Sequence, residues 1–297
     1  MAISISTDRT DSSGKELLTY GTAAFPAALF DDDLSKIRVT WHWHDELELV
    51  VIVKGEVILL ADGKELLLKE GEGYFANSGV LHSEKIITKD ALQHAIVFSP
   101  RIVASKEDLI WSSYVQPVLS SHSLSYLTLR PSLPWQKEIL ESAENAWKCG
   151  AYETEDYPIV VREELTGIMR LIRGHMEPSM FEHAGIAGRE RDELRIKKTI
   201  RFIEDHWRDQ IAIDEIAASA SISVSTLLRL YHDILHTTPI RYLIELRLDR
   251  IAETLKDNPD LKIKEAVYAG GFSDISYFNR CFIKRFHMTP TEYRRLK

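Results

Sequence analysis

The feature that most constrains this chain is a pattern of 16 residues that occurs twice near the C-terminus, the second time 51 positions after the first. Seven positions carry the same or a similar residue in both copies. They are Leu227, Arg229, Tyr231, His236, Thr238, Pro239 and Tyr242 in the first copy, and Phe278, Arg280, Phe282, His287, Thr289, Pro290 and Tyr293 in the second. A module used twice fits a protein that grips a repeating partner, and the DNA major groove faces the same way about every 10 bp.

Each copy predicts a helix-turn-helix, a unit whose second helix can enter a major groove. In the first copy, Ile213 and Ile216 lie on one face of a short helix, and the turn Ser219–Ile222 follows. Apolar residues at i, i+3, i+4 and i+7 of the next helix are predicted to pack inward, namely Leu227, Leu230, Tyr231 and Ile234. The second copy turns through Gly270-Gly271, and its predicted inward residues are Phe278, Cys281 and Phe282.

The whole C-terminal part is predicted to be helical. The expected helices cover residues 194–207, 213–220, 224–235, 239–256, 263–269, 275–286 and 290–296. Asp214, Ser223 and Asp274 are suitable N-caps. His236 and His287 lie just past a helix end, where a left-handed residue is common, so we interpret them as caps rather than metal ligands.

Charge divides the chain into two parts. The net charge is −8, yet residues 189–297 contain 20 Lys/Arg and 17 Asp/Glu, a net of +3. The other 188 residues contain 17 and 28, a net of −11. The repeat-bearing part is therefore the basic one, and the rest would repel phosphate.

The bulk sequence indicates a soluble protein of two domains, because 297 residues exceed the usual size of one. The polar N-terminus has no apolar signal region, and the longest apolar runs, such as Leu49–Val53, are strand-sized. Cys149 and Cys281 are expected to be buried thiols rather than a disulfide. We therefore expect a cytoplasmic protein without a membrane partner.

The N-terminal half is predicted to be β-rich, which gives an α+β chain. Short β-branched runs follow one another from Val39 to about Pro100, and Asp62-Gly63 between two of them indicates a hairpin. A small antiparallel barrel or sandwich is the expected result. From Leu133 the apolar period becomes helical, which predicts an antiparallel helix pair. The expected domains are a barrel (1–110), a helical dimerisation region (111–181), a linker (182–193) and a nucleic-acid-binding domain (194–297).

The second copy resembles the densest signature of the AraC/XylS family of transcription regulators. The residues that carry the resemblance are Gly271-Phe272, Asp274, Ser276-Tyr277-Phe278, Arg280, Phe282, Lys284, Phe286, Thr289-Pro290 and Tyr293-Arg294. The chain departs from the family pattern at His236 and His287, where glycine is usual, and at Ile275, where a polar residue is usual. The resemblance covers about residues 195–297.

This resemblance implies two recognition helices in successive major-groove segments, joined by a linker helix at Ile240–Leu255. The positions that match the reading positions are Ser225, Thr226, Leu228 and Arg229 in the first helix, and Ile275, Ser276, Asn279 and Arg280 in the second. Arginine can grip guanine or phosphate, asparagine can pair with adenine, and apolar side chains can meet thymine methyl groups. The alternative for Arg229 and Arg280 is phosphate contact or an internal ion pair.

The β-rich half contains a histidine pattern that resembles the two cupin motifs. His42, His44, Glu48 and Gly55 have the spacing of the first motif, and Gly71, Gly79 and His82 have that of the second. Asn77 and Ile86 replace the usual proline and asparagine. Residues two apart on a strand share a face, so these histidines and Glu48 can converge.

Three histidines and one carboxylate suit Fe, Mn, Ni or Zn. Sensor domains of the resembled family are cupin-like, however, and usually bind an organic effector without metal. We therefore expect His42, His44, Glu48 and His82 to line an effector pocket and expect no metal cofactor. A divalent metal on these four residues and a purely structural role stay open as alternatives. The aromatic residues nearby, Trp41, Trp43, Tyr74 and Phe75, could stack on a ligand ring or belong to the core.

Three classes of function fit these observations. The first is a transcription regulator, not an enzyme, that binds double-stranded promoter DNA under control of a small-molecule effector such as a sugar, as a homodimer, with RNA polymerase as a further partner. The second is a metal-dependent cupin enzyme fused to a DNA-binding domain. The third is a constitutive DNA-binding protein whose N-terminal half only dimerises. We favour the first class, because both halves match its parts in the expected order.

Overall fold

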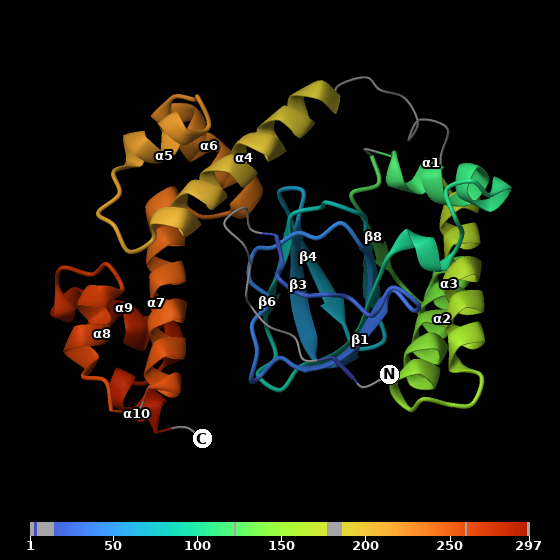
Figure 1. The fold of residues 1–297 in the computed structure, drawn as a ribbon, viewed down its shortest axis with the longest axis horizontal. Coiled ribbons are helices and arrows are strands. Elements are labelled where there is room, and N and C mark those ends of the chain that lie inside the picture. Colours follow the sequence, from blue (N-terminus) through green and yellow to red (C-terminus); the bar gives the residue numbers. More distant parts are fainter. Residues whose placement is uncertain (1–2, 5–14, 122, 177–185, 259, 296–297) are drawn as a thin grey trace. The chain divides into compact units, whose positions relative to one another are not determined.

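The computed structural model describes residues 3–4, 15–121, 123–176, 186–258 and 260–295. Contacts divide these residues into two compact units, one made mainly of residues 15–189 and the other of residues 190–297. The N-terminal unit combines β-strands with helices, and the C-terminal unit is helical (Figure 1). The predicted α+β fold class is therefore confirmed. Among the described residues, no helix combines the length and apolarity that a membrane crossing requires.

The strands of the N-terminal unit form two antiparallel sheets rather than one closed barrel. Their bounds are β1 Ala27–Asp33, β2 Leu47–Lys54, β3 Glu56–Ala61, β4 Lys64–Lys69, β5 Gly73–Ala76, β6 His82–Ile86, β7 Leu92–Phe98 and β8 Tyr126–Leu129. One sheet has the order β1-β7-β2-β5-β8, and the other has the order β4-β3-β6. The hairpin between β3 and β4 turns at Asp62 and Gly63, both with positive φ, as Asp-Gly predicts.

Strand β2 shows how the two faces of the larger sheet are used. Val50 and Ile52 pack toward the smaller sheet, in a core that also contains Val57 and Leu59 of β3. Leu49 on the opposite face joins a core shared with the helices. Because both faces are covered, β2 is a continuous apolar run rather than an alternating one.

Helices cover the outer face of the larger sheet. The long ones are α2 (Pro134–Ala151) and α3 (Tyr157–Gly174), and short helical segments occur at Pro100–Ile102, Trp111–Val115 and α1 (Gln116–Leu119). The indole Nε1 of Trp147 donates to the carbonyl oxygen of Phe30, 2.8 Å away, and so joins α2 to β1. The predicted helix pair is present.

Two strands lie outside the segment predicted as β. Strand β1 lies in the unassigned N-terminal stretch, and β8 lies in the segment predicted to be helical. Their pairings join Ala27 to Phe98 and Leu129 to Gly73, contacts far apart in sequence that local patterns do not reveal.

The C-terminal unit follows the predicted helices closely. They are α4 (Ile186–His206), α5 (Ile213–Ser219), α6 (Val224–Leu235), α7 (Pro239–Asp257), α8 (Ile263–Ala269), α9 (Ile275–Phe286) and α10 (Pro290–Arg294). Helix α7 runs between the α5–α6 pair near one of its ends and the α8–α9 pair near the other (Figure 1). Ser223 and Asp274 accept backbone N–H bonds as N-caps, and His236 and His287 are left-handed.

Some local predictions about the helices were wrong. Helix α4 begins at Ile186 rather than at the predicted residue 194, so it extends into the predicted linker 182–193, where the boundary between the two compact units falls. Residues 182–185 lie outside the described residues. The charge run was interpreted as a linker, but it can support a solvated helix, as the Lys197–Glu193 ion pair at 3.1 Å illustrates. Asp214 is not the N-cap of α5, because the helix begins at Ile213 and Ala212 is its N-cap. The Ala212 N–H donates to the Glu215 carboxylate. Leu235 is buried in place of Ile234.

Candidate DNA-contacting helices and a buried histidine cluster

The two candidate recognition helices rest on different cores. Helix α6 buries Leu227, Leu230 and Tyr231, and the Tyr231 hydroxyl group accepts from the Thr199 hydroxyl group of α4 at 3.2 Å. Helix α9 instead buries Phe278 and Phe282 in an aromatic cluster with Phe286 and Tyr293. These packed inner faces fix which side chains each helix leaves at its surface.

The predicted reading positions of α6 lie at the surface. Ser225, Leu228 and Arg229 are exposed, and Thr226 is half-buried. Arg229 makes two ion pairs, with Asp192 of α4 at 3.2 Å and with Asp233 at 3.5 Å. The internal ion pairs that we kept as an alternative for Arg229 are therefore present in this structure.

The predicted reading positions of α9 differ in exposure. Ser276 and Arg280 are exposed, and Asn279 is half-buried. Ile275 is also half-buried and packs against the Phe278–Phe282 core. We expected it to lie outside this core, and that expectation was wrong. The Arg280 guanidinium lies over the Tyr277 ring, 5.9 Å from its centroid. Among the described residues, no carboxylate forms an ion pair with Arg280.

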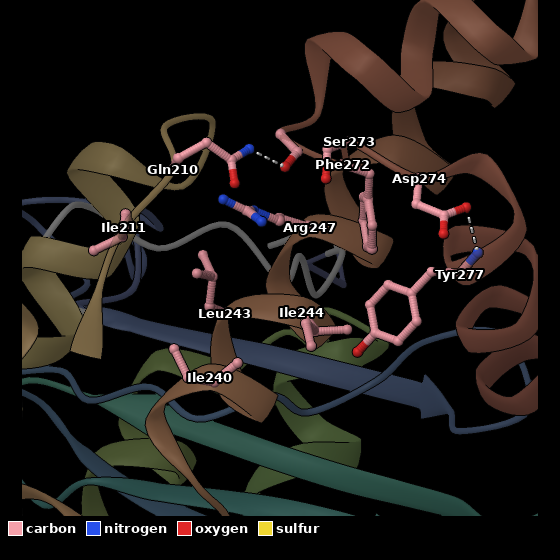
Figure 2. Close-up of a pocket in the computed structure, with 11 residues that line it drawn as sticks. Gln210, Ile211, Ile240, Leu243, Ile244, Arg247, Phe272, Ser273, Asp274 and Tyr277 are labelled. Carbon is pink, nitrogen blue, oxygen red and sulfur yellow. Dashed lines mark hydrogen bonds between the residues drawn. The ribbon is translucent and has the colours of Figure 1, made fainter.

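A cavity of about 260 Å³ lies where α7 meets the turn before α9 (Figure 2). Arg247 of α7 lines it, and its guanidinium donates to the carbonyl oxygens of Trp207 and Asp209. Gln210 donates to the carbonyl oxygen of Gly271 at 3.0 Å. Burial lowers the pKa of the Arg247 guanidinium from its ordinary value. These bonds join α7 and the second helix-turn-helix to the α4–α5 connection.

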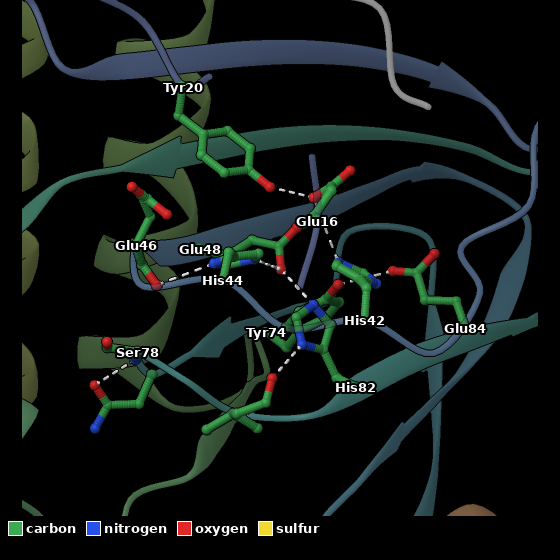
Figure 3. Close-up of polar contacts among 12 residues, drawn as sticks. Glu16, Tyr20, His42, His44, Glu46, Glu48, Tyr74, Ser78, His82 and Glu84 are labelled. Atoms are coloured by element: carbon green, nitrogen blue, oxygen red, sulfur yellow. Dashed lines mark hydrogen bonds and ion pairs between the residues drawn. The ribbon is translucent and has the colours of Figure 1, made fainter. Parts of the chain in front are cut away.

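In the N-terminal unit the four predicted pocket residues meet in one buried cluster (Figure 3). Their ligand-type atoms all lie within 4.8 Å of one another. His82 Nε2 is 2.8 Å and His44 Nε2 is 3.5 Å from Glu48 Oε2. Reciprocal backbone bonds of 3.0 Å between His42 and His82 bring the two motifs together. We call His42, His44, Glu48 and His82 the histidine quartet.

The three rings of the quartet are oriented in the same way. Each Nδ1 faces a backbone carbonyl oxygen two residues away, at 2.8 Å from Thr40 for His42, 3.1 Å from Glu46 for His44 and 2.9 Å from Val80 for His82. A carbonyl oxygen can only accept, so each Nδ1 carries the proton. The Nε2 atoms therefore point into the cluster.

Burial and charge compete within the quartet. Burial alone would raise the pKa of Glu48, but the His82 and His44 rings beside it outweigh burial and hold that pKa well below 4.5. Burial also lowers the pKa of His42 to about 3, so this ring is neutral at neutral pH. The cluster thus combines one carboxylate charge with at least one neutral imidazole.

Two further residues complete the cluster, and sequence reasoning missed both. Glu16 Oε2 lies 3.8 Å from His42 Nε2, and the Tyr20 hydroxyl group donates to the same carboxylate. Burial raises the pKa of Glu16 to about 7, although the Tyr20 hydrogen bond opposes this shift. The segment is positioned by the Glu16 N–H bond to the Trp43 carbonyl oxygen at 2.9 Å. Nothing in the spacing of Glu16 relates it to the histidines, so no local signal could have identified it.

A second acid lies near the quartet inside the same sheet pair. Glu84 accepts from the Tyr74 hydroxyl group at 2.9 Å, and burial together with the Glu48 charge raises its pKa to about 8. Tyr74 and Phe75 are fully buried, which confirms that at least two of the four predicted aromatic residues belong to the core. The Trp41 and Trp43 side chains are half-buried.

The structure explains why asparagine occupies position 77, where the second cupin motif usually has proline. Its side-chain amide is buried and donates to the carbonyl oxygens of Val118 at 2.8 Å and Leu124 at 3.0 Å. The usual proline could make neither bond, so Asn77 ties the segment after β5 to the turn before β8.

Comparisons with known proteins agree with both halves. The AraC-like ligand binding domain model matches residues 27–144, and a helix-turn-helix domain model matches residues 216–296. The chain is 29% identical over 290 residues to the HTH-type transcriptional regulator YdeC of Bacillus subtilis, which covers 96% of this chain and 97% of that protein. It is 23% identical over 256 residues to the HTH-type transcriptional activator RhaS of Citrobacter koseri, covering 85% and 86%.

The comparison with solved structures includes ToxT of Vibrio cholerae. That likeness has a TM-score of 0.43 and 11% identity, and it covers 90% of this chain and 96% of ToxT. The two matched domain models, together with these relatives, account for both parts of the sequence in the order found here. Both parts of the chain therefore match those of AraC-type DNA-binding transcription regulators, with an AraC-like ligand-binding domain in the N-terminal part.

Proposed function

We propose that this protein is a sequence-specific transcription regulator whose DNA binding is controlled by a small-molecule effector. Residues 194–297 would bind promoter DNA, and the effector would bind at the histidine quartet within residues 1–110. This proposal assigns the protein no catalytic reaction. The observation that carries it is the presence of two similarly capped helices, α6 and α9, in the basic part of the chain.

We propose that α6 and α9 read two successive major-groove segments. Helices that present Arg229 and Arg280 at equivalent positions suit a double-stranded partner, because each can reach guanine or phosphate. Ser225, Thr226 and Leu228 of α6 and Ser276 and Asn279 of α9 would supply further contacts. Ile275 would contribute less, because it is partly buried against the core of the second unit.

Sequencing of genomic DNA fragments retained by the purified full-length protein tests this proposal. We expect discrete sites with two short conserved blocks about one helical turn, roughly 10 bp, apart. Diffuse retention that fades as salt rises would contradict it, because that behaviour reflects phosphate contact alone. Leu228→Ala and Asn279→Ala should change the preferred sequence, and an equal loss for all sequences would show that these residues are not readers.

We propose that the effector is polar and that it binds inside the N-terminal unit. The buried quartet and the nearby Glu16 and Glu84 offer hydrogen-bonding groups in an otherwise apolar interior, an arrangement that suits a small polar ligand such as a sugar. An effector can act only if it binds two states of the protein with different affinities. The genes beside the enriched sites would nominate candidates for direct binding measurements.

We also propose a cytoplasmic homodimer that acts with RNA polymerase at promoters. Helices α2 and α3 lie in the segment predicted for dimerisation. Their main apolar stripes are buried in the unit, yet Tyr152 and Ile159 remain exposed at 73% and 62%. Sedimentation at micromolar concentration tests the dimer, and a monomer there would count against it.

A further inference from the structure

We propose that the histidine quartet binds one divalent first-row transition-metal ion and that Glu16 covers the remaining coordination position until an oxygen-donating effector replaces it. This inference deepens the proposed function, on which it rests, by giving the effector site a metal and the effector a chemical class. It departs from our expectation from the sequence that the site contains no metal.

The first argument is the orientation of the rings. Metal-binding histidines commonly donate their second ring N–H to a carbonyl or carboxylate oxygen, which fixes the tautomer and aims the other nitrogen at the ion. All three histidines of the quartet do this through backbone carbonyl oxygens, at 2.8–3.1 Å. Three independent rings therefore aim Nε2 at one point, where each nitrogen offers a lone pair to an ion once it carries no proton.

The second argument is that the converging atoms lack hydrogen bonds. Among the described residues, His44 Nε2, His82 Nε2 and Glu48 Oε2 are buried side-chain atoms without a hydrogen-bond partner. Glu48 Oε2 lies at ion-pair distance from both rings, 2.8 Å from His82 Nε2 and 3.5 Å from His44 Nε2. Buried polar atoms are costly unless they are paired, and a cation at the centre of the quartet would satisfy all of them.

The third argument is the spacing of the donors. Nitrogen and oxygen ligands lie about 2.0–2.2 Å from Zn²⁺, so two of them on one ion are at most about 4.3 Å apart. The four donor atoms here lie within 4.8 Å of one another, and Glu48 Oε2 is only 2.8 and 3.5 Å from two of the nitrogens. A shift of about half an ångström would bring the widest pair into range, which is a small rotation for an imidazole ring.

The donor set selects the class of ion. Three imidazole nitrogens and one carboxylate oxygen favour Mn, Fe, Co, Ni, Cu or Zn over Mg or Ca, which prefer oxygen ligands. The carboxylate offsets one of the two charges of such an ion. Binding would displace protons from the quartet, as it does wherever protonated ligands take up a metal.

Glu16 determines what else can reach this ion. Its carboxylate lies 3.8 Å from His42 Nε2, next to the quartet yet outside the four-residue set, and Tyr20 positions it from the other side. A carboxylate at this place can ligate the ion or be displaced by another oxygen donor. The effector that fits is therefore a small molecule with a carboxylate or adjacent hydroxyl groups.

Metal binding to the full-length protein tests the first part directly. Purified protein is stripped with a chelator, dialysed with Zn²⁺ and analysed for metal per chain, and affinity is measured by competition with a fluorescent zinc indicator. We expect one Zn²⁺ per chain with a Kd below about 1 µM. This Kd corresponds to a standard free energy of binding of about −8 kcal/mol. Sub-stoichiometric metal and no competition by the wild-type protein would overturn the proposal, whatever the variants do.

Variants assign the ion to the quartet. His44→Ala and Glu48→Gln should each weaken Zn²⁺ binding by at least about 100-fold, since even changes to residues that only support ligands cost about 10–100-fold. His232→Ala is the matched control, because this histidine is 85% exposed and lies in the other unit. Equal binding by all three variants would overturn the assignment. Circular dichroism of the Glu48→Gln protein checks that the loss is not a loss of fold.

The cobalt-substituted protein tests the part played by Glu16. We expect azide to change the visible Co²⁺ spectrum of Glu16→Ala at a concentration about 10-fold lower than in the wild type, because an internal competitor has been removed. Tyr20→Phe, which keeps the carboxylate but not its hydrogen bond, should give a smaller shift. Identical azide curves in all three proteins would show that Glu16 does not cover the ion.

These outcomes are separable from those of the proposed function. If the protein binds no metal but still retains discrete genomic sites, the metal inference fails and the regulator proposal stands. If it binds one Zn²⁺ at the quartet but retains DNA only diffusely, the metal site stands and the regulator proposal fails.

Discussion

The two helix-turn-helix units share a sequence pattern, but their turns differ in length and in the residue at the left-handed position. The first unit passes from α5 to α6 through residues 220–223, and the second passes from α8 to α9 through residues 270–274, one residue more. At the equivalent left-handed position the first unit has Ser221 with φ 55°, and the second has Gly271 with φ 81°. A Cβ atom on Gly271 would lie 2.8 Å from the carbonyl oxygen of Arg208 and 2.9 Å from Arg247 Nε. The second turn is therefore built into the core around Arg247, whereas the first is not.

The units also differ in how they hold their surface arginine. Arg229 is paired with two carboxylates, and Arg280 lies over an aromatic ring. Two arginines at equivalent positions of the repeat therefore differ in their interactions before DNA binds. The repeat thus specifies where each arginine lies, and the neighbouring residues determine whether it must break other interactions before it can contact DNA.

The largest expected effect is on the turns. Gly271→Ala should destabilise the C-terminal unit by about 2–4 kcal/mol, because it adds a left-handed non-glycine residue and a steric clash. Ser221→Gly, the matched change in the first unit, should alter stability by less than about 1 kcal/mol. Hydrogen exchange of peptides from α9 and α6 in the full-length protein measures both. Similar losses in the two variants would show that the turns are equivalent after all.

The next effect concerns DNA affinity. Arg280→Ala should weaken binding to the preferred site by about 1–3 kcal/mol, and Arg229→Ala by less, because Arg229 must first leave its ion pairs. Asp192→Asn should then strengthen binding, but only while Arg229 is present. A double-mutant cycle checks this: DNA affinity is measured by fluorescence anisotropy for the wild type, Asp192→Asn, Arg229→Ala and the variant with both changes. An equal gain from Asp192→Asn in the Arg229→Ala background would mean that simple charge repulsion is responsible.

A smaller effect distinguishes the two N-caps. Asp274 accepts from two N–H groups, those of Ser276 at 2.7 Å and Tyr277 at 3.1 Å, whereas Ser223 accepts from that of Thr226 alone at 3.2 Å. We expect Asp274→Ala to cost about 1–2 kcal/mol and Ser223→Ala about 0.5–1 kcal/mol. Thermal unfolding combined with exchange at the first turn of each helix measures the order. A larger cost for Ser223→Ala would reverse this part of the comparison.

The smallest effect is expected where the two units agree. His236 and His287 are both exposed and left-handed, with φ of 48° and 56°. His236→Gly and His287→Gly should each stabilise the unit by up to about 1 kcal/mol, because glycine adopts this conformation without a Cβ penalty. Equal shifts in melting temperature would confirm that the two helix ends are equivalent. A loss of stability in either variant would indicate that the imidazole makes a needed contact.

The helical part of the chain could be predicted almost completely from its sequence. The signals that define these helices act within one or two helical turns, so they can be identified without tertiary structure. They include N-caps such as Ser223 and Asp274, the Thr-Pro helix starts and an apolar period of 3.6 residues. The same is true of the Asp62-Gly63 hairpin. Errors occurred where a local signal fits two structures, as in the charged run that became the beginning of α4.

Tertiary structure alone decided the rest, since it depends on contacts between distant residues. The pairings of β1 with β7 and of β8 with β5, the approach of Glu16 to His42 and the ion pair between Arg229 and Asp192 join positions that no local pattern relates. The sequence by itself determined that three histidines and one acid could share a face. Only the packing of two sheets determined that their Nε2 atoms meet in a buried place, because burial and convergence are properties of the folded chain.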